Sequence, residues 1–271
     1  MADLDPILHR LRNGCRTMSY PDGKPPALPD RHGGGLRLDQ AKCPAGCEAC
    51  VPVCPTAAVT RELPDGPTRL DLGRCVSCAA CVEACNAGAI AWTGDHRLAV
   101  RLREDLVLGG NGCAEVRLAE RLDGRLRSLF GRSLRLRQVS AGGCNACEAD
   151  VNVLGTIGWD LGRFGVQFVA SPRHADGLLV TGPVTANMRL ALEKTYDAVP
   201  DPKLVIAVGA CAIAGGPFAG NDHAGTGAGE VIPIDLFIPG CPPHPLTILD
   251  GLLRLLGRVR DGRTTGRPES R

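Results

Sequence analysis

Cysteines in pairs and runs are the residues of this chain whose types and spacing could do chemistry. The segment SAGGCNACEAD, residues 140–150, places Cys144 and Cys147 three positions apart in a glycine-rich stretch. Such a pair could be a redox dithiol, half of a zinc site, half of an iron–sulfur site or a disulfide. The pair alone leaves these possibilities open, so the rest of the chain must decide among them.

The composition narrows the choice. The chain has 271 residues, 14 cysteines, a net charge of +2 and only 3% aromatic residues. The length suggests two domains, and the few aromatic side chains argue against a nucleic-acid partner. No apolar run reaches the roughly 20 residues that span a bilayer, and the N-terminal residues lack the apolar core of a signal peptide. We therefore expect a cytoplasmic chain with reduced thiols, in which metal binding is favoured over disulfides.

Eight cysteines form two runs between residues 43 and 85. The first run is CPAGCEACVPVCP, and the second, CVSCAACVEAC, has the spacing C-x2-C-x2-C-x3-C. Three closely spaced thiolates can bind three irons of a cubane, and the fourth iron takes a cysteine from the other run. A pair of zinc sites is the alternative, although such sites usually join two CxxC pairs across a longer gap.

This stretch resembles a two-cluster ferredoxin. The resemblance implies two 4Fe–4S clusters, one bound by Cys43, Cys47, Cys50 and Cys85, the other by Cys54, Cys75, Cys78 and Cys81. The sequence departs from the ferredoxin pattern in two ways, and neither removes a ligand. An extra residue before Cys47 distorts the first loop, and Asn86 follows the last cysteine where a proline is common.

The ferredoxin-like α+β domain spans residues 41–95, and further segments precede and follow it. A proline- and glycine-rich strap, residues 1–40, precedes it and contains a short amphipathic helix at residues 5–13. A linker at 96–133 follows, and ten arginines against five acids lie between residues 96 and 137. Apolar residues at helical spacing there predict an amphipathic helix: Val116, Ala119, Leu122, Leu126, Leu129 and Phe130. The polar tail, residues 258–271, is expected to be disordered.

Residues 134–257 alternate short apolar runs with helical patterns, which is typical of an open α/β sheet. The expected strands are LRLRQV, VQFVA, GLLVTG, KLVIAVGAC and VIPIDLFIPGC, with a crossover helix near 184–199 and a final helix ending near Gly257. Cys144 and Cys147, Cys211 and Cys241 each follow a strand. Open α/β sheets bind ligands beyond the carboxyl ends of their strands, so these four cysteines can converge. The nearby glycines allow backbone to approach sulfide, and we expect a third 4Fe–4S cluster there.

The segments AGGCNACEAD, VGACAIAGGPF and IPGCPPHP resemble the small subunit of group 4 membrane-bound [NiFe] hydrogenases, including formate hydrogenlyase. That family is related to the terminal-cluster subunit of complex I. Complex I relatives have two adjacent cysteines at the first position, whereas this chain has CxxC, as hydrogenases do. The resemblance implies a flavodoxin-like fold, and a proximal cluster on Cys144, Cys147, Cys211 and Cys241.

We therefore expect an electron-relay subunit with three 4Fe–4S clusters, whose catalytic site lies in a large [NiFe] partner subunit. Other expected partners are a redox donor or acceptor protein and, indirectly, membrane-embedded subunits that hold the chain at the inner face of the membrane. Two alternatives stay open: a nickel-free, complex I-like oxidoreductase subunit, and a non-enzymatic metal-binding scaffold. The sequence assigns no role to Cys15, Cys113, Glu148, Arg173 or His174.

Overall fold

The computed structural model describes residues 5–29, 32–61, 66–109, 116–130 and 133–259. Its C-terminal half contains a five-stranded, all-parallel sheet in the order β10-β9-β8-β6-β7. The strands are β6 (Leu134–Ser140), β7 (Val166–Phe168), β8 (Gly177–Thr181), β9 (Leu204–Val208) and β10 (Leu236–Ile238). Numbered along the chain, this is the order 2-1-3-4-5 of the flavodoxin-like fold. The expected α/β class is confirmed.

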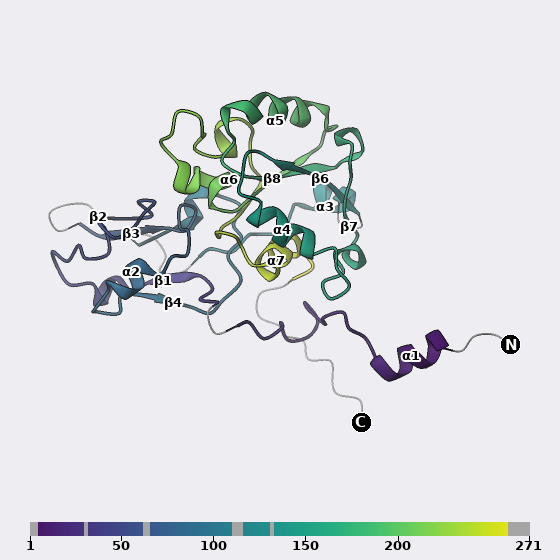
Figure 1. Cartoon of the computed structure of the whole chain (residues 1–271), viewed down its shortest axis with the longest axis horizontal. Coiled ribbons are helices and arrows are strands. Elements are labelled where there is room, and N and C mark those ends of the chain that lie inside the picture. The colour runs from purple at the N-terminus through teal and green to yellow at the C-terminus, as the bar shows by residue number, and fades with distance from the viewer. Residues whose placement is uncertain (1–4, 30–31, 62–65, 110–115, 131–132, 260–271) are drawn as a thin grey trace.

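Helices cover both faces of this sheet. The all-buried strands β8 and β9 pack one face against α5 (Ala186–Ala198), whose Leu192 is fully buried. The other face packs against α4 (Ala146–Val153) and α7 (Pro245–Leu255), which also contact each other. Figure 1 shows α5 on one side of the sheet and α4 with α7 on the other. Continuous apolar strands are expected in a sheet buried in this way.

Helix α7 has clear start and stop signals in its sequence. Pro245 occupies the first helical position, and the His244 side chain accepts a hydrogen bond from Leu246 N at 3.1 Å. At the other end Gly257 has φ +68° and donates to Arg254 O, while Arg258 N donates to Leu253 O. These two bonds form a Schellman motif, so the helix stops where the glycine predicts.

The N-terminal half forms a small α+β unit, seen beside the larger sheet in Figure 1. Two short antiparallel sheets pair β1 with β4, and β3 with both β2 and β5. The bounds are β1 (Leu36–Leu38), β2 (Val59–Arg61), β3 (Thr68–Asp71), α2 (Ala80–Glu83), β4 (Ile90–Trp92) and β5 (Val107–Gly109).

Short helical segments lie in both halves. They are α6 (Ala210–Ala214), η1 (Gln40–Lys42), η2 (Arg103–Leu106), η3 (Leu161–Phe164), η4 (Pro172–His174), η5 (Gly216–Phe218) and η6 (Ala228–Glu230).

The two halves share a hydrophobic core. Leu70, Leu72 and Leu106 from the N-terminal half belong to the same buried cluster as Ala212 and Ile213 of α6. Val100 also exchanges two backbone hydrogen bonds with Phe237 of β10, at 3.0 and 2.8 Å. The linker thus adds a short antiparallel bridge to the edge of the parallel sheet, which fixes one half against the other.

The amphipathic helix expected across residues 116–130 is shorter than the spacing suggests. The helix α3 spans Gly124–Phe130, whereas residues 116–123 have no regular secondary structure. Their backbone instead bonds neighbouring segments, with Ala119 N donating to Ala99 O and Leu122 N to Leu255 O. The buried side chains in this stretch face those segments, so tertiary contacts outweigh the helical periodicity.

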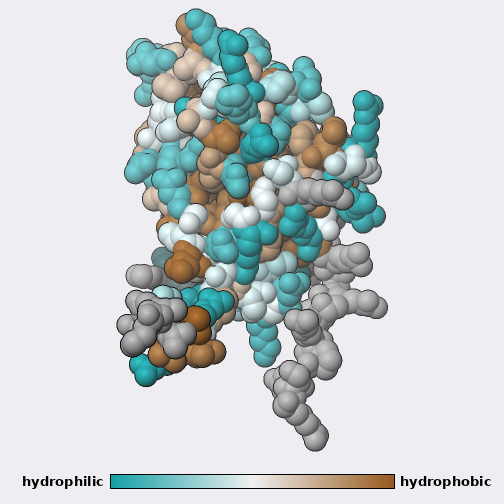
Figure 2. All heavy atoms as spheres, turned by 90° about the vertical axis from the view of Figure 1, so that its right-hand side faces the viewer, coloured by the Kyte–Doolittle hydropathy of each residue, from teal (hydrophilic) through white to brown (hydrophobic). Residues whose placement is uncertain are grey.

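The strap begins with α1 (Asp5–Asn13), the expected short helix, which projects from the body in Figure 1. Its apolar residues Ile7, Leu8 and Leu11 are 58%, 46% and 75% exposed. Figure 2 views the molecule from this side and shows apolar groups among polar ones. None of the described helices is long and apolar enough to cross a membrane. The tail expected to be disordered lies, from residue 260 onward, outside the described residues.

After α1 the strap is anchored to the C-terminal half. Arg163 donates to the carbonyl oxygens of Met18 and Tyr20, each at 2.7 Å. The Tyr20 hydroxyl donates to Asp250 of α7, whose other carboxylate oxygen pairs with Arg254 at 2.6 Å. Both charged groups are buried, so the hydroxyl and the guanidinium together satisfy a carboxylate that would otherwise be costly to bury.

Candidate metal centres

The first cavity of interest is bordered by four cysteines from both runs: Cys43, Cys47, Cys50 and Cys85. It has an empty volume of about 500 Å³. The extra residue of the first run is accommodated in a turn, in which Cys47 N donates to Pro44 O and Gly46 takes φ +70°. Burial, and after it the thiols of Cys43, Cys85 and Cys47, raises the pKa of Cys50 despite a compensating backbone hydrogen bond.

A second cavity, of about 310 Å³, is bordered by the other four cysteines of the runs: Cys54, Cys75, Cys78 and Cys81. Helix α2 contributes Cys81, and Ala79 before it has φ +67°. Backbone amides face two of the sulfurs, with Ala58 N donating to Cys54 at 3.1 Å and Ser77 N to Cys75 at 3.4 Å. Each run therefore sends its last cysteine to the cavity of the other run.

The remaining cysteines meet at the carboxyl ends of three strands. Cys144 and Cys147 follow β6, Cys211 is the second residue of α6 after β9, and Cys241 follows β10. Burial, and then Glu148 and the other three thiols, raises the pKa of Cys147 to about 12. Burial, with Cys241 and Cys144 next, raises the pKa of Cys211 to about 11. The four thiols are electrostatic neighbours although 97 residues separate the first from the last.

Glycines in this region provide space for sulfur. A Cβ atom on Gly209 would lie 2.5 Å from the Cys147 sulfur, and one on Gly216 would lie 2.7 Å from the Cys211 sulfur. Both residues also have positive φ, at +90° and +56°. Neither position could accept a side chain without moving a thiol, because such contacts are far below van der Waals distance.

The three sets are also neighbours of one another. Burial raises the pKa of Cys75 to about 11, against a hydrogen bond from Ser77, and Cys54, Cys78 and Cys241 add to the increase. Burial raises the pKa of Cys81 to about 12, and Cys50 is among the thiols that add to it. Cys241 belongs to the third set and Cys50 to the first. The second set therefore has a neighbour in each of the other two.

Comparison with known proteins identifies both halves. Residues 144–255 match the family described as NADH ubiquinone oxidoreductase, 20 Kd subunit, and residues 42–90 match a 4Fe-4S dicluster domain. A relative named probable membrane-bound hydrogenase subunit mbhJ, from Pyrococcus furiosus, is 41% identical over 55% of this chain and 89% of its own length. The chain belongs to the NADH ubiquinone oxidoreductase 20 kDa subunit family.

Two further similarities accompany this match, one to a sequence and one to a solved structure. A NADH-quinone oxidoreductase subunit from Bacteroides thetaiotaomicron is 41% identical over 43% of this chain and 59% of its own length. A solved structure of the membrane-bound sulfane sulfur reductase, an archaeal respiratory membrane complex, aligns at 32% identity and a TM-score of 0.44, covering 52% of this chain and 78% of that chain. The relatives named here are subunits of oxidoreductase complexes, and this chain is an electron-transfer subunit with a 4Fe–4S domain.

The residues present fit iron–sulfur clusters. Each of the first two sets surrounds a cavity with four thiols, and no group of three His, Cys, Asp or Glu within the described residues is arranged to hold a single metal ion. Amide donors face sulfur in the second set, as is common where sulfurs are hydrogen-bonded to tune a cluster's potential. In the third set, Gly209 and Gly216 leave the sulfurs free of side-chain crowding.

Glu148, beside Cys147, accepts hydrogen bonds from the ends of two strands. Its carboxylate is 6% exposed and accepts hydrogen bonds from Ser140 at 2.7 Å and Thr181 at 2.6 Å. Burial raises the pKa of Glu148, but these two hydroxyl donors and a backbone hydrogen bond together outweigh it and leave the pKa below its ordinary value. A buried negative charge thus adjoins the third set. Ser140 and Thr181 end two neighbouring strands, which the sequence pattern could indicate only once the strand order was known.

Arg61 is a second residue that sequence reasoning missed. Its guanidinium donates to Cys47 O at 2.6 Å and approaches the Cys43 sulfur at 3.6 Å. The remaining unassigned residues lie elsewhere: Cys15, Arg173 and His174 are exposed, and Cys113 lies outside the described residues. Cys15 has a pKa lowered chiefly by its backbone hydrogen bond with Thr17.

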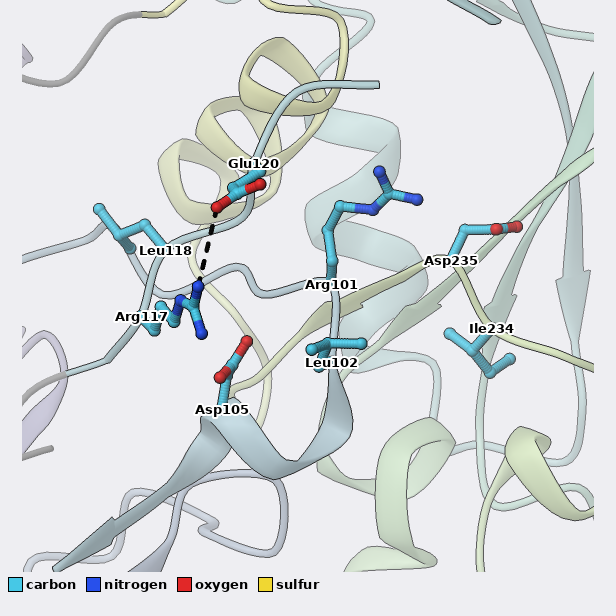
Figure 3. A pocket seen from close by; sticks show the side chains of 8 residues that line it. All are labelled: Arg101, Leu102, Asp105, Arg117, Leu118, Glu120, Ile234 and Asp235. Atoms are coloured by element: carbon cyan, nitrogen blue, oxygen red, sulfur yellow. Dashed lines mark ion pairs between the residues drawn. The ribbon is translucent and has the colours of Figure 1, made fainter. Parts of the chain in front are cut away.

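A larger surface pocket beside the linker has no cysteine. It has an empty volume of about 780 Å³ and is shown in Figure 3. Arg117 pairs with Glu120 at 3.9 Å across its rim, and Arg101 and Asp235 also line it. Charges of both signs and the absence of a thiol among its lining residues separate this pocket from the three cysteine sets.

Proposed function

We propose that this chain binds three 4Fe–4S clusters and relays electrons to a catalytic partner subunit. The proposed ligand sets are Cys43, Cys47, Cys50 and Cys85 (set 1), Cys54, Cys75, Cys78 and Cys81 (set 2), and Cys144, Cys147, Cys211 and Cys241 (set 3). Clusters of this type take up and release single electrons when bound. The corresponding units are the strap at 1–40, the dicluster domain at 41–95, the linker at 96–133, the α/β domain at 134–257 and the tail at 258–271.

The observation that carries the proposal is the order of the three sets. Cys50 of set 1 is an electrostatic neighbour of Cys81 in set 2, and Cys75 of set 2 is a neighbour of Cys241 in set 3. A storage or structural role needs no such order. Sets that follow one another through a shared core, with set 3 at the carboxyl ends of the strands, suit a relay between two molecular surfaces.

For the partner we propose a large [NiFe] subunit that interconverts protons and hydrogen. The support is the mbhJ relative, named a probable membrane-bound hydrogenase subunit, together with the CxxC spacing of Cys144 and Cys147. Partner subunits would hold the chain at the inner face of a membrane. The exposed apolar residues of α1 provide surface for such contacts.

A nickel-free, complex I-like complex is the second candidate. It is favoured by the NADH-quinone oxidoreductase relative from Bacteroides thetaiotaomicron, which is also 41% identical. The two candidates share all three ligand sets in this chain and differ in the partner. The metal content of the co-purified large subunit distinguishes them.

Iron analysis tests the cluster count. Three clusters require about 12 iron atoms per chain after anaerobic reconstitution. A fully reconstituted sample with about eight iron and eight sulfide atoms per chain would remove set 3 from the proposal. A colourless protein that binds zinc would replace it with the scaffold function.

Replacement of Cys144 or Cys147 by alanine in the intact complex tests the relay. Hydrogen-dependent reduction of the dicluster domain, followed by electron paramagnetic resonance (EPR), should be lost. Hydrogen–deuterium exchange at the partner should persist, because it needs no net electron transfer. Wild-type rates of reduction in these variants would place Cys144 and Cys147 outside the electron path. A wild-type complex without nickel, hydrogen oxidation or exchange would favour the complex I-like candidate.

A further inference from the structure

Gly73 lies where the turn that precedes Cys75 meets helix α6. A Cβ atom on Gly73 would lie 2.8 Å from Cγ2 of Ile213 and 2.7 Å from Cζ of Arg103. Contacts this short force a neighbour to move. Ile213 has little room to move, because it is 6% exposed and belongs to the core shared by the two halves.

Position 73 requires glycine because a Cβ atom has no space there, and not because of the backbone conformation. Gly46 and Gly88, near other cysteines of the dicluster domain, have positive φ and no atom within 4 Å of a built Cβ. Gly73 is the reverse case. Its φ lies outside the left-handed region, so alanine would suit the backbone, yet the Cβ would collide. The absent side chain therefore permits a close approach between segments.

The turn around Gly73 is held firmly. Asp71 accepts a hydrogen bond from Gly73 N at 2.9 Å. Asp71 also forms an ion pair with Arg103 at 2.6 Å, and both charged side chains are more than half buried. Arg103 is thereby kept beside Gly73 and cannot swing away without breaking this pair. A side chain at position 73 would thus press on Ile213, the whole turn or both.

The contact joins two candidate ligand sets. Gly73 is two residues before Cys75 of set 2, and Ile213 is two residues after Cys211 of set 3. We propose that Gly73 is a positioning residue that sets the separation between sets 2 and 3. This inference rests on the proposed function, because the separation matters only if both sets bind redox groups. Electron tunnelling falls exponentially with distance, so a small displacement here lowers the transfer rate while all twelve ligands remain.

The test compares Gly73→Ala with Gly158→Ala in the reconstituted full-length chain. Gly158 also has φ outside the left-handed region, but a Cβ atom at that position would have no neighbour within 4 Å. Iron content, magnetic coupling between the reduced centres of sets 2 and 3 in pulsed EPR, and electron equilibration after flash reduction are measured. For Gly73→Ala we expect wild-type iron, weaker coupling and a several-fold slower equilibration. Gly158→Ala should match wild type in all three.

A second substitution separates positioning from a general defect. Ile213→Ala removes the Cγ2 atom that the new methyl group would meet, whereas the contact with Arg103 remains, so Gly73→Ala with Ile213→Ala should recover part of the coupling and rate relative to Ile213→Ala alone. Wild-type coupling in Gly73→Ala at full iron content would overturn the inference. So would a loss of iron or of folding that Ile213→Ala does not restore. An iron content of about eight atoms per chain in the wild type would instead overturn the proposed function, and this inference with it.

Discussion

The dicluster domain and the α/β domain gather four-cysteine sets in different ways. Sets 1 and 2 come from two short runs, and each takes three cysteines from one run and one from the other. Set 3 comes from the ends of three strands and spans residues 144–241. Local turns therefore build the first two sets, whereas the sheet builds the third. Damage to a turn should affect one set, and damage to the strand ends should affect set 3 alone.

The exchange of last cysteines between the runs gives the largest expected effect. Cys54 belongs to the first run but borders the cavity of set 2. Cys54→Ala should lower the iron content from about 12 to about 8 per chain and remove the EPR signal of set 2. Set 1 should keep its signal. Loss of the set 1 signal instead would mean that each run binds its own cluster. Cys15→Ala, at an exposed cysteine, is the control and should keep all the iron.

Replacement of Gly209 tests set 3 at the strand ends, as Cys54→Ala tests set 2. Gly209 and Gly46 both have positive φ, so alanine strains the backbone at each, by about 1–3 kcal/mol, and more at Gly209, whose φ +90° and ψ 156° are essentially restricted to glycine. Only Gly209 also faces a sulfur, that of Cys147 at 2.5 Å from a built Cβ. Gly209→Ala should therefore lose the cluster of set 3 and keep those of sets 1 and 2. Gly46→Ala should keep all three, despite lying between two ligands of set 1. Equal iron contents in the two variants would show that strain, and not the sulfur contact, decides.

The two domains also differ in how much could be predicted from sequence. The cysteines within the runs Cys43–Cys54 and Cys75–Cys85 are close together in the sequence, so each run could be recognised without knowledge of the fold. For set 3, strand periodicity and the rule for carboxyl ends of parallel strands sufficed to place four cysteines at one edge. The non-helical path of residues 116–123 could not be predicted, because it depends on hydrogen bonds to Ala99 and Leu255 from distant parts of the chain. The contacts of Arg61 and Gly73 were missed for the same reason.

Alkaline pH should distinguish the chain without clusters from the reconstituted chain. Burial and neighbouring thiols raise the pKa of Cys211 to about 11 and that of Cys147 to about 12, from an ordinary value near 9.0. A raised pKa stabilises the fold below the unfolded value, and this stability is lost as pH rises through the folded value. The cluster-free chain should thus lose thermal stability between about pH 9 and 12. Bound thiolates carry no such proton, so the reconstituted chain should show a weaker dependence over this range. Parallel pH profiles of the two forms would contradict the pKa assignment.

The smallest expected effect concerns the potential of set 1, which has a cationic neighbour. Reduction adds a negative charge, and the Arg61 guanidinium, 3.6 Å from the Cys43 sulfur, favours the reduced form. Arg61→Gln should therefore lower the potential of set 1. A partly screened charge worth on the order of 1 kcal/mol corresponds to about 40 mV for one electron. Arg37→Gln, on the exposed side of β1, removes the same charge from the same domain and should shift the potential less. Redox titration followed by EPR measures both. Equal shifts would mean that net charge, and not the contact with Cys43, sets the potential.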